Sequence, residues 1–148
     1  MTCDPRYQKS VLNAYTNSVQ SVIAQGSVLF NNNNPLTGCS IAHASGSSSV
    51  QLRKPGIYLI NFNADASTTA TAGGTITLQL SNNGVIVPGA SSTATTTSNT
   101  AIVTVSFSTI IRVLRSCDCV NNQTNLTVIN TGSAASLSNA NIVVVKLA

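Results

Sequence analysis

The chain has 148 residues, of which 43% are hydrophobic and only 7% are charged; Ser, Thr and Asn fill more than a third of it, and Glu is absent. A soluble helix normally carries Glu, Lys and Arg on its wet face, so this composition favours strands and turns over helices. The three carboxylates, Asp4, Asp65 and Asp118, are too few and too scattered for glycosidase or metallo-hydrolase chemistry.

The net charge of +4 comes from few basic residues and still fewer acidic ones. Nucleic-acid binding usually needs clustered Lys and Arg beside aromatic platforms. The basic residues are instead spread along the sequence, so we expect isolated surface charges and no nucleic-acid partner. They are Arg6, Lys9, Arg53, Lys54, Arg112, Arg115 and Lys146. No run of 18 apolar residues occurs, so no membrane span is predicted, and the first 25 residues lack the apolar core of a signal peptide.

The N-terminal residues are the least strand-like part of the chain. Leu12, Tyr15, Val19 and Val22 follow a heptad-like spacing that would place them on one helix face. We therefore predict an attachment arm or short helix over residues 1–17, followed by one domain over residues 18–148. Strand-like residues begin that domain, and residues 31–35 have the composition of a turn.

From residue 40 onward, short strands alternate with turn signals. Strands are predicted over residues 40–43, 49–52, 57–64, 75–81, 85–87, 101–114, 125–131 and 141–147. Asn82-Asn83-Gly84 is a strong hairpin signal, whereas Pro88-Gly89 is expected to end a strand and leave a loop over residues 90–100. About nine or ten strands at this spacing predict an all-β sandwich, jelly roll or barrel.

The faces of the predicted strands differ. Residues 75–81 alternate between apolar and polar side chains, whereas residues 57–62, 102–111 and 142–145 are apolar on both faces. Such strands must be covered on both sides, and the chain offers no helix to cover them. We expect an obligate oligomer; the alternative is that these strands are central in a monomeric barrel. The predicted trimer-interface residues are Tyr58, Ile60, Phe62, Val105, Phe107, Val143 and Val145.

Five segments carry a resemblance to a known family, and the first of them, residues 26–30, is similar to the first strand of its domains. Residues 55–62 (PGIYLINF) resemble a strand of tumour-necrosis-factor-like and complement-globular-head domains, and residues 78–90 resemble the hairpin that follows it. Residues 125–130 and 140–147 are similar to the last two strands of these domains. The likeness covers roughly residues 18–148. It implies a two-sheet jelly roll of ten strands that forms a tight homotrimer, with the inner sheets around a threefold axis.

The Ser-, Thr- and Asn-rich composition resembles the short phage and Gram-positive bacterial form of this family. Spore-surface members usually carry a collagen-like stalk, and this sequence has no Gly-x-y repeat. The resemblance thus implies a non-enzymatic virion structural protein, such as a head fibre, decoration protein or tail appendage, on the virion surface. The N-terminal arm would bind other virion or capsid proteins. The alternatives are a host-surface or glycan-binding module, or a bacterial spore-surface or cell-surface domain.

The cysteines and the single histidine leave several chemical alternatives. Cys39, His43, Cys117 and Cys119 have the composition of a Cys₃His zinc site, although Cys-x-Cys is an uncommon ligand spacing. Disulfides among these three cysteines and Cys3 are an alternative, and free thiols are the ordinary case. A catalytic triad would need an orienting carboxylate near the one histidine, and serine is too abundant for a neighbouring serine to be informative. We therefore expect no catalytic site and no cofactor.

Overall fold

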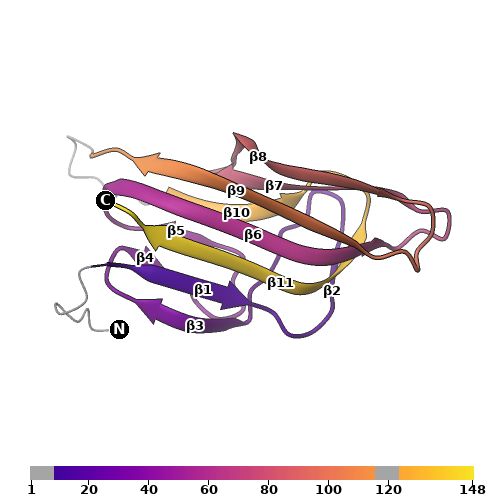
Figure 1. Cartoon of the computed structure of the whole chain (residues 1–148), viewed down its shortest axis with the longest axis horizontal. Helices are drawn as coiled ribbons and strands as arrows, with labels where there is room; N and C mark the ends of the chain where they lie inside the picture. The colour runs from indigo at the N-terminus through magenta and orange to yellow at the C-terminus, as the bar shows by residue number, and fades with distance from the viewer. Residues whose placement is uncertain (1–8, 116–123) are drawn as a thin grey trace.

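The computed structural model describes residues 9–115 and 124–148, which contain eleven strands and no helix. The strands form two antiparallel sheets that pack face to face (Figure 1). Strands that are neighbours in a sheet are often distant in sequence, as in the pairing of β1 with β11. The predicted all-β jelly-roll sandwich is confirmed.

The two sheets are named here after their central strands. The β6 sheet has the order β3 (Asn32–Thr37), β1 (Val11–Tyr15), β11 (Ala135–Lys146), β6 (Gly56–Thr68) and β9 (Val103–Val113), and β2 (Gln20–Val22) also pairs with β11. The β7 sheet has the order β4 (Ile41–Ala42), β5 (Val50–Leu52), β10 (Thr124–Asn130), β7 (Gly74–Asn82) and β8 (Val85–Thr96).

The hairpin between β7 and β8 follows from its sequence. Asn83 and Gly84 have positive φ angles of 50° and 85°, as a two-residue type I′ turn requires. The predicted end of the return strand at Pro88-Gly89 is wrong, because β8 continues to residue 96. The register shifts opposite this point, and β8 is an edge strand, so the missing N–H of Pro88 breaks no interior ladder bond.

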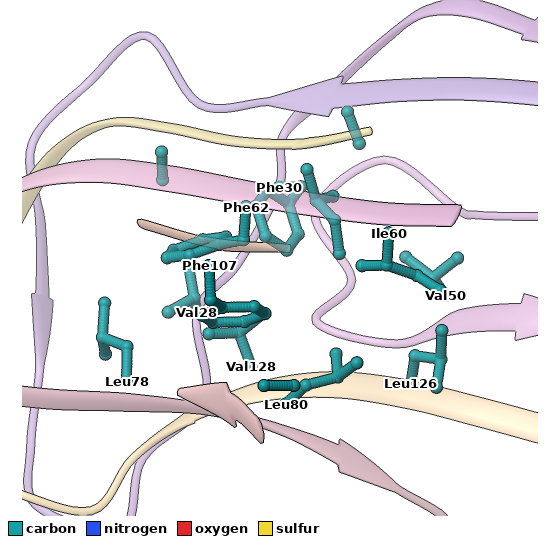
Figure 2. Packing of buried hydrophobic residues seen from close by; sticks show 14 of the residues in the cluster. Val28, Phe30, Val50, Ile60, Phe62, Leu78, Leu80, Phe107, Leu126 and Val128 are labelled. Carbon is teal, nitrogen blue, oxygen red and sulfur yellow. The ribbon is translucent and has the colours of Figure 1, made fainter. Parts of the chain in front are cut away.

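Aromatic side chains fill the middle of the sandwich (Figure 2). Phe62 of β6 stacks on Phe107 of β9 with ring centroids 5.2 Å apart. Phe30 meets Phe62 edge to face at 6.3 Å. Leu78 and Leu80 of β7 enter the same core from the other sheet. The apolar face that alternation predicted for residues 75–81 therefore lies inside the sandwich.

The boundary predicted after residue 17 is wrong over the described residues. Val11–Tyr15 forms β1, which pairs with β11 from Val11↔Val145 to Tyr15↔Asn141. Leu12 and Ala14 are fully buried in the core. Leu12 and Ala14 are two residues apart, which is the period of a strand. Ala14 is small and only weakly hydrophobic, so the helix-like spacing of Leu12 and Tyr15 was the stronger signal in the sequence. Residues 1–8 of the predicted arm lie outside the described residues.

Two further segments differ from the sequence predictions. Most of the turn predicted over residues 31–35 lies instead in the edge strand β3, which pairs with β1. The last strand begins at Ala135 rather than at residue 141, because a bulge between Ser138 and Asn141 lets β11 pair with β6 on both sides of it. Bulges interrupt the alternation that sequence reasoning relies on.

Candidate functional site: an assembly face on the β6 sheet

The outer face of the β6 sheet carries an apolar row. Cross-strand pairing aligns Val11 of β1 with Val145 of β11, Val145 with Leu59 of β6, and Leu59 with Ile110 of β9. These side chains alternate with the buried core residues, so they point away from the sandwich. Ile110 is 60% exposed. A continuous row of large apolar side chains across four strands is suited to contact with another protein surface.

Polar rows follow on the same face, farther from the end of the sheet where β9 finishes. The next row across the four strands is Asn13, Val143, Asn61 and Ser108, and the one after it is Tyr15, Asn141, Asn63 and Ser106. Asn141 donates its side-chain N–H to Asn13 Oδ1, and Asn13 Nδ2 donates to the Asn34 carbonyl at 3.0 Å. The face thus changes from apolar to amide- and hydroxyl-rich along the strands.

Five of the seven predicted interface residues lie inside the protomer. Each is at most 8% exposed, and they are Tyr58, Ile60, Phe62, Val105 and Phe107. Their strands are apolar on both faces, so the sequence did not tell which set points inward; the larger aromatic side chains fill the core. The side chains that alternate with these five residues, such as Leu59, point outward instead and are the ones that can contact a partner. Val143 and Val145 lie on the outer face, and their contact with a partner stays a prediction.

A shallow hollow continues the apolar row at the edge of the sandwich. Its volume is about 280 Å³, and it lies between the edge strands β8 and β9. Val85, Ile86 and Pro88 line one side, and Ile110 and Ile111 line the other. Val85 is 71% exposed. The apolar surface therefore reaches from the sheet face around the β9 edge, where the β6 sheet has no further strand.

The residues that were considered as a zinc site do not form a cluster within the described part of the chain. Cys39 is disulfide-bonded, so its sulfur is not the thiolate that zinc binds. Cys3, Cys117 and Cys119 lie outside the described residues. Among residues 9–115 and 124–148, no three His, Cys, Asp or Glu side chains lie close enough together to bind one metal ion.

The single histidine has a structural role. His43 Nδ1 lies 2.5 Å from Asn33 Oδ1, and Nε2 lies 2.9 Å from the Ser47 carbonyl oxygen. These contacts hold β3 to the loop after β4. Asp65, the one carboxylate side chain that the structure describes, accepts hydrogen bonds from Thr104 and Asn139 instead of orienting the histidine. The arrangement is not that of a catalytic triad.

A second hollow lies beside His43. It has a volume of about 420 Å³ and is lined by backbone and side chains from the segment around β4 and β5, including Cys39, Ser49, Gln51 and Arg53. Its polar groups are amide, hydroxyl, guanidinium and the imidazole of His43. Cys39 and His43, the two described residues of the four considered for zinc, both line this hollow.

Comparison with known proteins places this fold. No protein-family model and no curated protein sequence matches the chain. The globular domain of zebrafish complement 1qA has a similar structure, with a TM-score of 0.67 and 13% identity over 94% of this chain and 98% of that one. This chain has the tumour-necrosis-factor-like and complement-globular-head fold. Murine APRIL is similar with a TM-score of 0.65 and 16% identity over 95% of this chain and all of that one.

The PRD1 vertex protein P5 is a more distant structural neighbour. It has a TM-score of 0.51 and 18% identity, over 94% of this chain and 97% of the P5 chain. At these low sequence identities, the structural similarity shows a shared fold and does not show a shared role. Among the described residues, no helix is long and apolar enough to cross a membrane.

Proposed function

We propose that the chain is a non-enzymatic structural protein that assembles as a homotrimer through the outer face of its β6 sheet. The apolar row formed by Val11, Val145, Leu59 and Ile110 carries this proposal. Each large apolar side chain that becomes fully buried contributes about 1.5–3 kcal/mol. The sequence resemblance to tumour-necrosis-factor-like domains, which implies a trimer, supports this reading, and the shared fold supports the resemblance.

Sedimentation equilibrium tests the assembly. The wild type should show three times the chain mass of 15.2 kDa at micromolar concentration. Leu59→Lys places a charge within the apolar row and should give monomers. The matched control is Thr127→Lys, since Thr127 is also half-buried but lies on the β7 sheet; this variant should stay trimeric. A wild type that sediments as a stable monomer contradicts the proposal.

We further propose that the trimer is a virion surface component, such as a head fibre, a decoration protein or a tail appendage. The hydroxyl- and amide-rich composition and the fold shared with the PRD1 vertex protein P5 support this assignment. Mass spectrometry of purified particles should detect the chain, and its gene should neighbour portal and capsid genes. Sporulation genes in that neighbourhood would support the spore-surface alternative instead.

Because residues 11–15 form strand β1, we propose that only residues 1–8 serve as the N-terminal arm that binds other virion proteins. Deletion of residues 2–8 should leave the trimer intact and abolish incorporation into particles. Deletion of residues 2–17 removes β1, including the buried Leu12 and Ala14, and should unfold the sheet edge. Normal incorporation of the 2–8 deletion would exclude docking through this segment.

A glycan-binding role is the second candidate, and the hollow beside His43 is the observation that favours it. Its amide and guanidinium groups, from Gln51 and Arg53, can hydrogen-bond to sugar hydroxyl or carboxylate groups. A saturable signal on a glycan array that Gln51→Ala abolishes would support this role. A protein with only a structural role should give no saturable signal.

A further inference from the structure

The fold gathers basic residues that are dispersed in the sequence. β6 begins at one end of the sandwich, β9 and β11 finish there, and β1 starts there, at the left in Figure 1. All the described Lys and Arg residues lie at these strand ends or in the adjoining segments. They are Lys9, Arg53, Lys54, Arg112, Arg115 and Lys146, and we call this surface the basic end.

Hydrogen bonds link three of these positions on one side of the basic end. The Lys146 N–H donates to the carbonyl of Ser10, the residue after Lys9, at 3.0 Å. The Ser10 hydroxyl accepts the Ser40 N–H at 2.9 Å. The Ser40 carbonyl in turn accepts the Arg53 N–H at 2.7 Å. The backbones of Lys9, Lys146 and Arg53 are therefore held close together by the core of the fold.

Strand pairing brings the other positions to the same end. Lys146 lies opposite Tyr58 in the pairing of β11 with β6, and the Tyr58 hydroxyl donates to the Lys54 carbonyl at 2.6 Å. Arg112 lies opposite Ile57 on the other side of β6. Arg115 follows two residues after β9 finishes. The pairing of the strands therefore fixes where Lys146 and Arg112 lie at the basic end.

No described Asp or Glu side chain balances this charge. Asp65 is the only acidic side chain among the described residues, and it lies on β6 eight residues beyond Ile57, or about 26 Å along the strand. Among the described residues, no basic side chain forms an ion pair with an Asp or Glu side chain. Asp4 and Asp118 lie outside the described residues, and counting them the chain still has a net charge of +4. The basic end therefore carries a positive potential that attracts anionic partners.

Apolar side chains lie among the basic ones. A hollow of about 380 Å³ is lined by Arg112 and Arg115 together with Pro55, Ile57 and Leu114, among others. Leu114 is 64% exposed. Arginine beside exposed apolar groups is typical of protein–protein interfaces. The bases of a nucleic acid would instead need exposed aromatic side chains, which the described part of this surface lacks, Tyr58 being fully buried.

We propose that the basic end is a docking surface for an acidic face of another protein. The guanidinium groups of Arg112 and Arg115 would pair with carboxylates, and Leu114 would pack on an apolar side chain between them. Such a surface would orient the sandwich with its long axis pointing away from the partner. This docking surface is separate from the proposed trimer face and is present on one protomer as well as on three.

Fluorescence anisotropy with labelled polyglutamate of about 20 residues tests this proposal with the full chain at low salt. Lys54→Gln combined with Arg115→Gln removes two positive charges from the basic end. The matched control is Thr71→Glu combined with Ala72→Glu, which changes the net charge equally in the exposed loop at the opposite end. The first variant should bind about fivefold more weakly or worse, and the control should change binding less than twofold.

Further arms separate the classes of partner. Equal losses in both double variants, or no binding by the wild type, would overturn the docking surface. Tighter binding to polyphosphate or to a DNA duplex of matched charge would overturn the assignment to a protein. Leu114→Ser should weaken binding of a Glu-Glu-Leu repeat peptide at least twofold but not of polyglutamate; equal effects would refute the apolar contact. Sedimentation of each variant shows whether a loss of binding is accompanied by a change in assembly. If the first double variant misfolds, Lys9→Gln combined with Arg53→Gln replaces it.

Discussion

Asn130 should be one of the costliest polar residues to replace. Its side chain is fully buried at the end of β10. Asn130 Nδ2 donates to the carbonyls of Val22 at 3.2 Å and Ser133 at 2.8 Å, and Oδ1 accepts the Gly132 N–H at 3.0 Å. Asn130→Ala leaves these three backbone groups without that partner. At about 1 kcal/mol for each hydrogen bond, the free energy of unfolding should fall by about 3 kcal/mol.

Asn130→Asp keeps the shape of the side chain but replaces a donor with an acceptor. Burial and the two facing carbonyl oxygens disfavour the carboxylate, so they raise its folded-state pKa above the unfolded value of about 3.9. The protonated acid can still donate one hydrogen bond. Its other oxygen can still accept the Gly132 N–H, so below the unfolded pKa this variant should be more stable than Asn130→Ala. As the pH rises from there to the folded pKa, stability should fall by about 1.4 kcal/mol per pH unit.

Urea unfolding followed by circular dichroism, at pH 4 and pH 7 and at one chain concentration, measures both effects. The exposed Asn99, whose side chain makes no hydrogen bond, supplies the matched controls Asn99→Ala and Asn99→Asp, which should change stability by less than about 0.5 kcal/mol. The reasoning is refuted if Asn130→Ala costs less than about 1 kcal/mol. It is also refuted if Asn130→Asp loses equal stability at both pH values.

Three other predictions concern the core. Phe62→Ala removes the ring between Phe30 and Phe107 and should lower the free energy of unfolding by about 3–5 kcal/mol in urea titrations, with Phe62→Leu costing less. Ser81→Ala removes a fully buried hydroxyl that has no hydrogen-bond partner, so calorimetry should show unchanged or higher stability. Burial raises the pKa of Tyr58, so stability should fall as the pH rises above about 10, and Tyr58→Phe should remove this slope.

Local patterns in the sequence predicted much of the fold. The clean alternation of residues 75–81 and the Asn83-Gly84 turn gave the hairpin, because both signals depend only on neighbouring residues. Pro88-Gly89 misled because its effect depends on where the strand lies in the sheet. On the edge strand β8, with a register shift opposite, the pair does not end the strand.

The candidate assembly face was harder to predict. The sequence indicated that residues 57–60 are apolar on both faces, yet it could not tell whether Tyr58 or Leu59 points inward. That choice depends on how rings from other strands, such as Phe30 and Phe107, fill the core. The clustering of basic residues was invisible for a similar reason. Lys9 and Lys146 are far apart in sequence and meet only through the pairing of β1 with β11.

Among the described residues, Asp65 lies far from the basic side chains, and these charges alone make an electric dipole along the strands of each protomer. In a parallel trimer the three dipoles add, whereas in an antiparallel pair they would cancel. Each protomer then repels its neighbours at the basic end, most strongly in dilute salt. An acidic partner that neutralises this end would therefore also tighten the trimer, and trimers would bind it more strongly than separate protomers. Attachment and assembly would reinforce each other through charge alone, without a change of shape.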